Sequence, residues 1–193
     1  MERPDEELLK DYLTGNDEKA AEMLFFRYKT RILNFCLRML GSRADAEDVT
    51  AEVFLAFFAR SYTPHPEAKF STCAYTVARN QCISQIRKRK NLVSVWFSSQ
   101  GGGSREEREI PDLEDLASQG LEKKEAAVLV RAALARLPHE QREVIVLREY
   151  HELSYEEISQ VVNCSLENVK ILIFRGRERL KTALSSLIKE DQR

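Results

Sequence analysis

Apolar side chains recur at steps of three and four residues along most of this 193-residue chain, and this spacing limits its fold more than any other feature. Because an α-helix has 3.6 residues per turn, such a repeat places the apolar side chains on one helical face. No segment shows the alternation of apolar and polar residues that is typical of a β-strand. The sequence therefore predicts an all-α protein in which each helix buries one face.

One stretch interrupts this spacing. The sequence Ser-Ser-Gln-Gly-Gly-Gly-Ser at 98–104 has the composition of a flexible linker, and a mostly acidic segment follows it. We therefore expect two small helical domains, at 1–92 and 121–193, joined by a flexible linker at 93–120. Trp96 and Phe97 fall within the expected linker, where they could dock on a partner or pack against their own domain.

The first half predicts three helices. The first runs from Ala21 to Gly41, a residue suited to the left-handed C-cap. Ser42 begins the second helix, which runs to about Arg60, because Ser-Arg-Ala-Asp resembles a capping box. Ser71 opens the third helix after a Thr-Pro-His-Pro loop, since neither proline can lie inside a helix.

The last two helices have helix-turn-helix spacing. The capping box Ser-Tyr-Glu-Glu at 154–157 begins a short helix, and Asn-Cys-Ser at 163–165 turns the chain into a longer basic helix. This order is typical of the helix-turn-helix, with an ordinary helical hairpin as the alternative. Four residues of the last helix are expected to face inward: Val169, Ile173, Gly176 and Leu180.

Charge is distributed unevenly, although the formal net charge is only −1. Residues 1–22 carry eight acidic and three basic side chains, whereas residues 79–90 carry five basic side chains and no acidic one. Residues 166–181 carry five basic side chains against two acidic ones. Two basic segments in an otherwise acidic chain indicate local contacts with nucleic-acid phosphates.

Neither a membrane segment nor an enzyme active site is indicated. No apolar run approaches the roughly 18 residues of a membrane span, and the acidic start is unlike a signal peptide, so we expect a cytoplasmic protein without membrane insertion. The four cysteines and three histidines lack metal-ligand spacing, which predicts buried thiols and no metal or cofactor. Without a GxxxxGK[ST] motif or a nucleophile–base set, the chain is expected not to be an enzyme.

Three segments follow one another along the chain: DAEDVTAEVFLAFF at 45–58, the helix at 70–90 that begins FSTCAYTVARN, and the C-terminal motifs LPHEQREVIVL at 137–147, SYEEI at 154–158 and RGRERL at 175–180. In this order they resemble the extracytoplasmic-function (ECF) sigma factors, of the bacterial primary sigma factor family. The resemblance implies a sigma factor that binds core RNA polymerase and directs promoter recognition, melting and transcription initiation. The alternative is a stand-alone helix-turn-helix transcriptional regulator, which leaves the first ninety residues unexplained; a helical enzyme and a protein-interaction adaptor have less support.

The resemblance also implies two kinds of site. Carboxylates beside an apolar residue suit a protein interface, and the polymerase-binding residues would be Asp45, Asp48, Glu52 and Leu55. Unpaired promoter bases call for a cationic track with aromatic or amide side chains, here Tyr62, His65, Tyr75, Arg79, Asn80, Arg87, Lys88 and Lys90. The alternatives are core packing for Tyr75 and a solvated helix end for the basic run. The last helix would meet upstream duplex DNA through base edges, phosphates and a thymine methyl, using Asn168, Lys170, Ile171, Phe174 and Arg175.

Ile171 and Phe174 are expected to face outward, where exposed apolar side chains indicate a covering partner. The candidates are promoter DNA, an anti-sigma factor, or the first domain of the same chain. The family usually has Val-Lys-Ser-Arg-Leu where this chain has Val-Lys-Ile-Leu-Ile at 169–173. We expect a closed or inhibitor-bound form that buries this helix, and weak promoter binding without polymerase.

Overall fold

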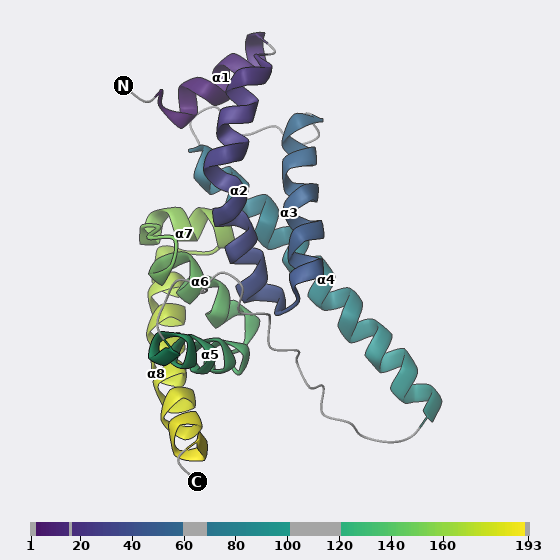
Figure 1. The fold of residues 1–193 in the computed structure, drawn as a ribbon, viewed down its shortest axis with the longest axis vertical. Coiled ribbons are helices and arrows are strands. Elements are labelled where there is room, and N and C mark those ends of the chain that lie inside the picture. The colour runs from purple at the N-terminus through teal and green to yellow at the C-terminus, as the bar shows by residue number, and fades with distance from the viewer. Residues whose placement is uncertain (1–2, 16, 60–68, 101–120, 192–193) are drawn as a thin grey trace.

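The computed structural model describes residues 3–15, 17–59, 69–100 and 121–191, and within these it describes the side chains except those at 90–100, 121–125 and 190–191. All regular structure in these ranges is helical, which confirms the all-α prediction (Figure 1). The helices in order are α1 (Asp5–Gly15), α2 (Glu18–Leu40), α3 (Arg43–Phe58), α4 (Phe70–Gln100), α5 (Leu121–Ala135), α6 (His139–Glu149), α7 (Tyr155–Val162) and α8 (Leu166–Asp191).

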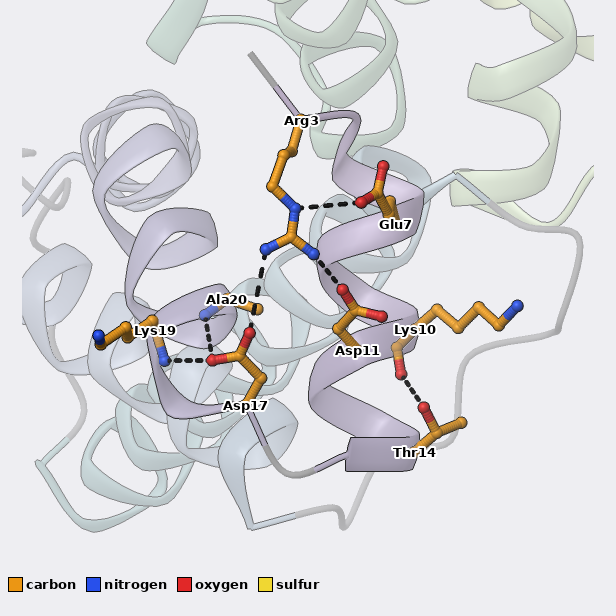
Figure 2. Close-up of polar contacts among 8 residues, drawn as sticks. All are labelled: Arg3, Glu7, Lys10, Asp11, Thr14, Asp17, Lys19 and Ala20. Atoms are coloured by element: carbon orange, nitrogen blue, oxygen red, sulfur yellow. Dashed lines mark hydrogen bonds and ion pairs between the residues drawn. The ribbon is translucent and has the colours of Figure 1, made fainter. Parts of the chain in front are cut away.

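The helix α1 was not predicted, and a charged cluster holds it in place (Figure 2). Arg3 donates to Glu7 at 3.1 Å and to Asp11, and one of its guanidinium nitrogens lies 3.9 Å from Asp17. Asp17 is also the N-cap of α2, where its carboxylate accepts hydrogen bonds from two amides of the first turn. Arg3 therefore ties α1 to the beginning of α2.

The turn between α2 and α3 confirms two predicted caps. Gly41 adopts φ 73°, a left-handed conformation that favours glycine, and its amide donates to the carbonyl of Leu37. The hydroxyl of Ser42 accepts a hydrogen bond from the amide of Asp45. Since the chain reverses over so few residues, α2 and α3 lie side by side as a hairpin, and α4 packs against both (Figure 1).

The helix α4 extends further than predicted. It continues to Gln100, so residues 93–100, assigned to the linker from sequence, are helical. The side chains of Trp96 and Phe97 and the whole segment 101–120 lie outside the described residues.

The C-terminal helices confirm the expected helix-turn-helix. Ser154 and Glu157 form the predicted capping box, and Asn163 ends α7 with a left-handed φ of 53°. Val169, Ile173 and Gly176 are buried, as predicted, on the face of α8 that meets α6. A Cβ atom added to Gly176 would lie 2.8 Å from Cγ1 of Ile145, so glycine permits this close approach of the two helices.

The N-terminal helices α1–α4 and the C-terminal helices α5–α8 are packed against each other, although the linker composition left their relative orientation open. The helix α7 contacts α4, while α5 and α6 contact α2 (Figure 1). Buried apolar side chains from both halves form one continuous cluster. None of the described helices has the length and apolarity that a membrane crossing requires.

Candidate functional site

The outer face of α3 carries the residues predicted to bind polymerase. Asp48 and Glu52 are exposed, and the side chain of Leu55 is 63% exposed beside them. Asp45 differs, because its carboxylate forms an ion pair with Arg89 on α4. Three of the four predicted residues therefore offer their side chains to a partner, and the fourth joins α3 to the basic end of α4.

Apolar side chains that the sequence reasoning missed extend this face. Phe26 on α2 is 57% exposed, and Met23 and Phe58 are partly exposed near it. Phe25 links them to α3, since its ring contacts those of Phe26 and Phe54 at centroid distances of 5.6 and 4.8 Å. The sequence signal available for this patch was the adjacent Phe-Phe pair at 25–26, since neighbouring residues on a helix point in directions about 100° apart and only Phe25 lies near the apolar stripe.

The face of α4 predicted to bind unpaired DNA is divided. Asn80, Arg87 and Lys88 are exposed, as that role requires. Tyr62, His65 and the side chain of Lys90 lie outside the described residues. Tyr75 and Arg79, by contrast, face the C-terminal helices.

Tyr75 is only 2% exposed, which corrects the expectation that it faces DNA in this arrangement. Its hydroxyl lies 2.8 Å from Nδ1 of His151, in the loop between α6 and α7, and the two ring centroids are 4.8 Å apart. The ring of Phe35 on α2 also contacts that of His151, at a centroid distance of 6.0 Å. Burial is the main cause that raises the pKa of Tyr75 and lowers that of His151 to about 3.

Arg79 makes a two-pronged ion pair across the same interface. Its Nε and Nη2 donate to the two carboxylate oxygens of Glu143 on α6, at 2.9 and 3.2 Å. The Glu143 side chain is 2% exposed, and burial raises the pKa of its carboxyl although Arg79 opposes that shift. A buried carboxylate of this kind depends on its cation, so Arg79 is engaged within the chain.

Two further polar contacts cross between the halves. Arg142, buried on α6, donates to the carbonyl oxygens of Leu134, Ala135 and Leu137 at the end of α5 and to that of Met39 at the end of α2. Lys69 lies 2.8 Å from Glu157, the capping residue of α7. Sequence reasoning missed His151, Glu143 and Arg142, because no local pattern identifies a partner that lies on a distant helix.

The residues of α8 that were predicted to face outward do so. All five residues predicted to bind DNA there are exposed: Asn168, Lys170, Ile171, Phe174 and Arg175. Ile171 is 45% exposed and Phe174 68% exposed, so the closed arrangement does not bury this helix face. Of the three candidate covers, the N-terminal domain does not cover this face here, because it packs on α5, α6 and α7 instead.

Two protein families match the two halves. Residues 24–92 match the family described as Sigma-70 region 2. The matched range includes α3 and most of α4. Residues 127–180 match Sigma-70 region 4, which contains the helix-turn-helix.

Whole proteins show the same likeness over nearly the full chain. The ECF RNA polymerase sigma factor SigW of Bacillus subtilis is 30% identical, over 97% of this chain and 100% of its own length. The ECF RNA polymerase sigma-E factor of Escherichia coli is 27% identical, over 95% of this chain and 96% of its own length. The sigma factor RpoE of Bartonella quintana, solved in complex with the anti-sigma factor NepR, shares the fold with a TM-score of 0.68 at 22% identity, covering 85% of this chain and 96% of that one.

The ordered motifs, the exposed acidic and basic helix faces and these matches agree on one family. The chain belongs to the ECF sigma factors of RNA polymerase, and it functions in transcription initiation as a DNA-binding, polymerase-binding subunit.

Proposed function

We propose that the two halves act as separate sigma domains, at 1–92 and 121–193, with 93–120 between them. In this division the first domain binds core polymerase and melts the promoter, and the second recognises the upstream element. Neither step requires the chain to catalyse a reaction, and we expect it to act in the cytoplasm. The stand-alone regulator is not favoured, because it gives no role to the region 2 match at 24–92.

The polymerase surface is proposed to be the outer face of α3 with the neighbouring end of α2. The observation that carries this proposal is the exposure of Leu55 on the helix that also exposes the carboxylates of Asp48 and Glu52. Phe26 on the packed helix α2 is exposed as well. Apolar anchors supply binding energy at such an interface, and rim charges set orientation and association rate.

Charge reversal tests this surface. The double variant Asp48→Lys, Glu52→Lys is expected to weaken binding to core polymerase by roughly tenfold while leaving the helical content unchanged. Glu178→Lys, an exposed reversal on α8, is the matched control and should bind normally. Binding of the double variant equal to that of the control would remove α3 from the polymerase interface.

Promoter melting is proposed to depend on the exposed side of α4. Asn80 offers both a donor and an acceptor to an unpaired base, and Arg87 and Lys88 can follow the backbone phosphates. Asn80→Ala should reduce permanganate reactivity of unpaired promoter thymines more than it reduces polymerase binding. Normal promoter opening by this variant would make Asn80 a structural residue.

Upstream recognition is proposed to use α8. Lys170 and Arg175 can contact phosphates or guanine edges, and Ile171 can contact a thymine methyl. The same exposed apolar pair, Ile171 and Phe174, also suits an anti-sigma factor, the kind of partner that the related Bartonella quintana protein has in its solved complex.

A further inference from the structure

The contact between the two domains contains a buried titratable side chain, His151. Its ring is 9% exposed, and its neighbours come from both halves of the chain: Tyr75 from α4 and Phe35 from α2. Nδ1 is within hydrogen-bond distance of the Tyr75 hydroxyl, whereas Nε2 is buried with no hydrogen-bond partner among the described residues. A neutral ring can adopt the tautomer in which Nδ1 donates to the Tyr75 hydroxyl and Nε2 carries no proton, so that no buried N–H is left without an acceptor.

A protonated ring would not be tolerated. It carries a proton on both nitrogens, so Nε2 would become a buried donor without an acceptor. The charged side chains that act on the ring are Arg38 and Arg31, both cations on α2. Arg38 itself stacks on Tyr150, at 4.0 Å from the ring centroid. Burial and these two cations favour the neutral ring as long as the domains stay together.

The contact between the two domains covers the inner face of α4. The same interface buries Tyr75 and pairs Arg79 with Glu143, whose carboxylate takes the position on the guanidinium that a DNA phosphate could otherwise take. Promoter strands therefore cannot reach these two residues until α6 and α7 move away from α4. The exposed part of α4, by contrast, does not depend on separation.

We propose that His151 is an acid-sensitive latch, which holds the C-terminal domain over the inner face of α4 and releases it when the ring takes up a proton. The binding of DNA by the uncovered face of α4 rests on the proposed function of α4. The separation of the two domains does not. Because the closed form holds a depressed pKa, it is favoured above the ordinary value of 6.5 and loses that advantage as the pH falls below it.

The size of the response follows from the two pKa values. With 6.5 in the open form and about 3 in the closed form, lowering the pH from 7.5 to 5.5 raises the ratio of open to closed chains about tenfold. Glu143 acts in the opposite direction, because its raised pKa makes the closed form bind a proton more tightly than the open form. Glu143→Gln removes that opposing titration and should leave the response to pH equal or larger.

Single-molecule energy transfer on the full chain measures the ratio. Dyes at Glu18→Cys and Glu178→Cys, both exposed and on different domains, report separation in a Cys164→Ser background. The open-to-closed ratio should rise about tenfold between pH 7.5 and 5.5. His151→Gln should respond less than twofold. His139→Gln, which removes a histidine of the same domain that acts on Glu143 rather than on His151, should still respond severalfold.

Three results would overturn the latch: a ratio that does not change with pH, an equal response in His151→Gln, or no open chains at either pH. His151→Phe keeps an aromatic ring without a titrating nitrogen, so it replaces His151→Gln if circular dichroism shows that the glutamine variant is unfolded. A pH response that persists while Asn80→Ala opens promoters normally would keep the latch and remove the proposed role of α4.

Discussion

Replacing Gly176 by alanine should destabilise the C-terminal domain, although alanine is the better helix former. Gly176 lies within α8 against α6, and an added Cβ would meet Cγ1 of Ile145 at 2.8 Å and Cδ1 at 3.2 Å. Ile145 is buried and β-branched on its own helix, so it has little freedom to move aside. The two helices must therefore separate locally, which disturbs the helix that carries the proposed upstream contacts.

The expected magnitude is a balance of two effects. Overpacking of a well-packed core costs about 1–3 kcal/mol, whereas changing glycine to alanine in a helix interior gains about 1 kcal/mol. We therefore expect the free energy of unfolding to fall by up to about 2 kcal/mol. Ile145→Ala alone should cost about 2–5 kcal/mol through its cavity, but the double variant should lose less than the sum by roughly 1 kcal/mol, because the new methyl enters that cavity.

Urea unfolding of the full chain, followed by far-ultraviolet circular dichroism, measures these values. Gly15→Ala is the matched control, since a Cβ there meets nothing within 4 Å at the end of α1, and it should leave stability unchanged or slightly higher. If Gly176→Ala were as stable as the control variant, the close approach of α6 and α8 would not be the reason for glycine at this position.

Three further outcomes are expected. Ser154→Ala removes the hydroxyl of the capping box and should lower the free energy of unfolding by about 1 kcal/mol, whereas Ser154→Asn should restore most of it. Arg142→Met should lower it by about 3 kcal/mol or more, and Arg142→Lys should not rescue it, because one ammonium cannot serve carbonyls in several directions. Alanine at Arg87 and Lys88 should reduce the slope of log affinity against log salt for promoter DNA by about one per residue, and an unchanged slope would exclude phosphate contacts.

Local signals in the sequence were sufficient to predict most of the helices. Gly41 and Ser154 fixed helix ends because a cap depends only on residues within one turn. The inward face of α8 followed from the spacing of Val169 and Ile173. The same reasoning missed α1, although its Leu8, Leu9 and Tyr12 are buried in the core, because this apolar face is short and lies among acidic residues.

The exposure of a candidate site residue was predictable only where its position on its own helix decides that exposure. Asn80 and Lys170 are exposed because their helical positions point away from the core. For Tyr75 the sequence left a DNA contact and core packing both open, because its neighbours Phe35 and His151 lie on other helices or loops, His151 being 76 positions further along the chain. Packing between domains is a property of two surfaces together, and periodicity within one helix carries no information about the second surface.

We expect this sigma factor to engage promoters through core polymerase rather than alone. In the free chain Arg79 is paired with Glu143 and Tyr75 is covered, so the inner face of α4 is closed to DNA while the two domains stay packed together. Gel-shift titration of one promoter fragment with the free chain, and again with the chain bound to core polymerase, tests this directly. We expect nanomolar binding only with polymerase present, and comparable nanomolar affinity of the free chain would contradict the account and favour a stand-alone regulator.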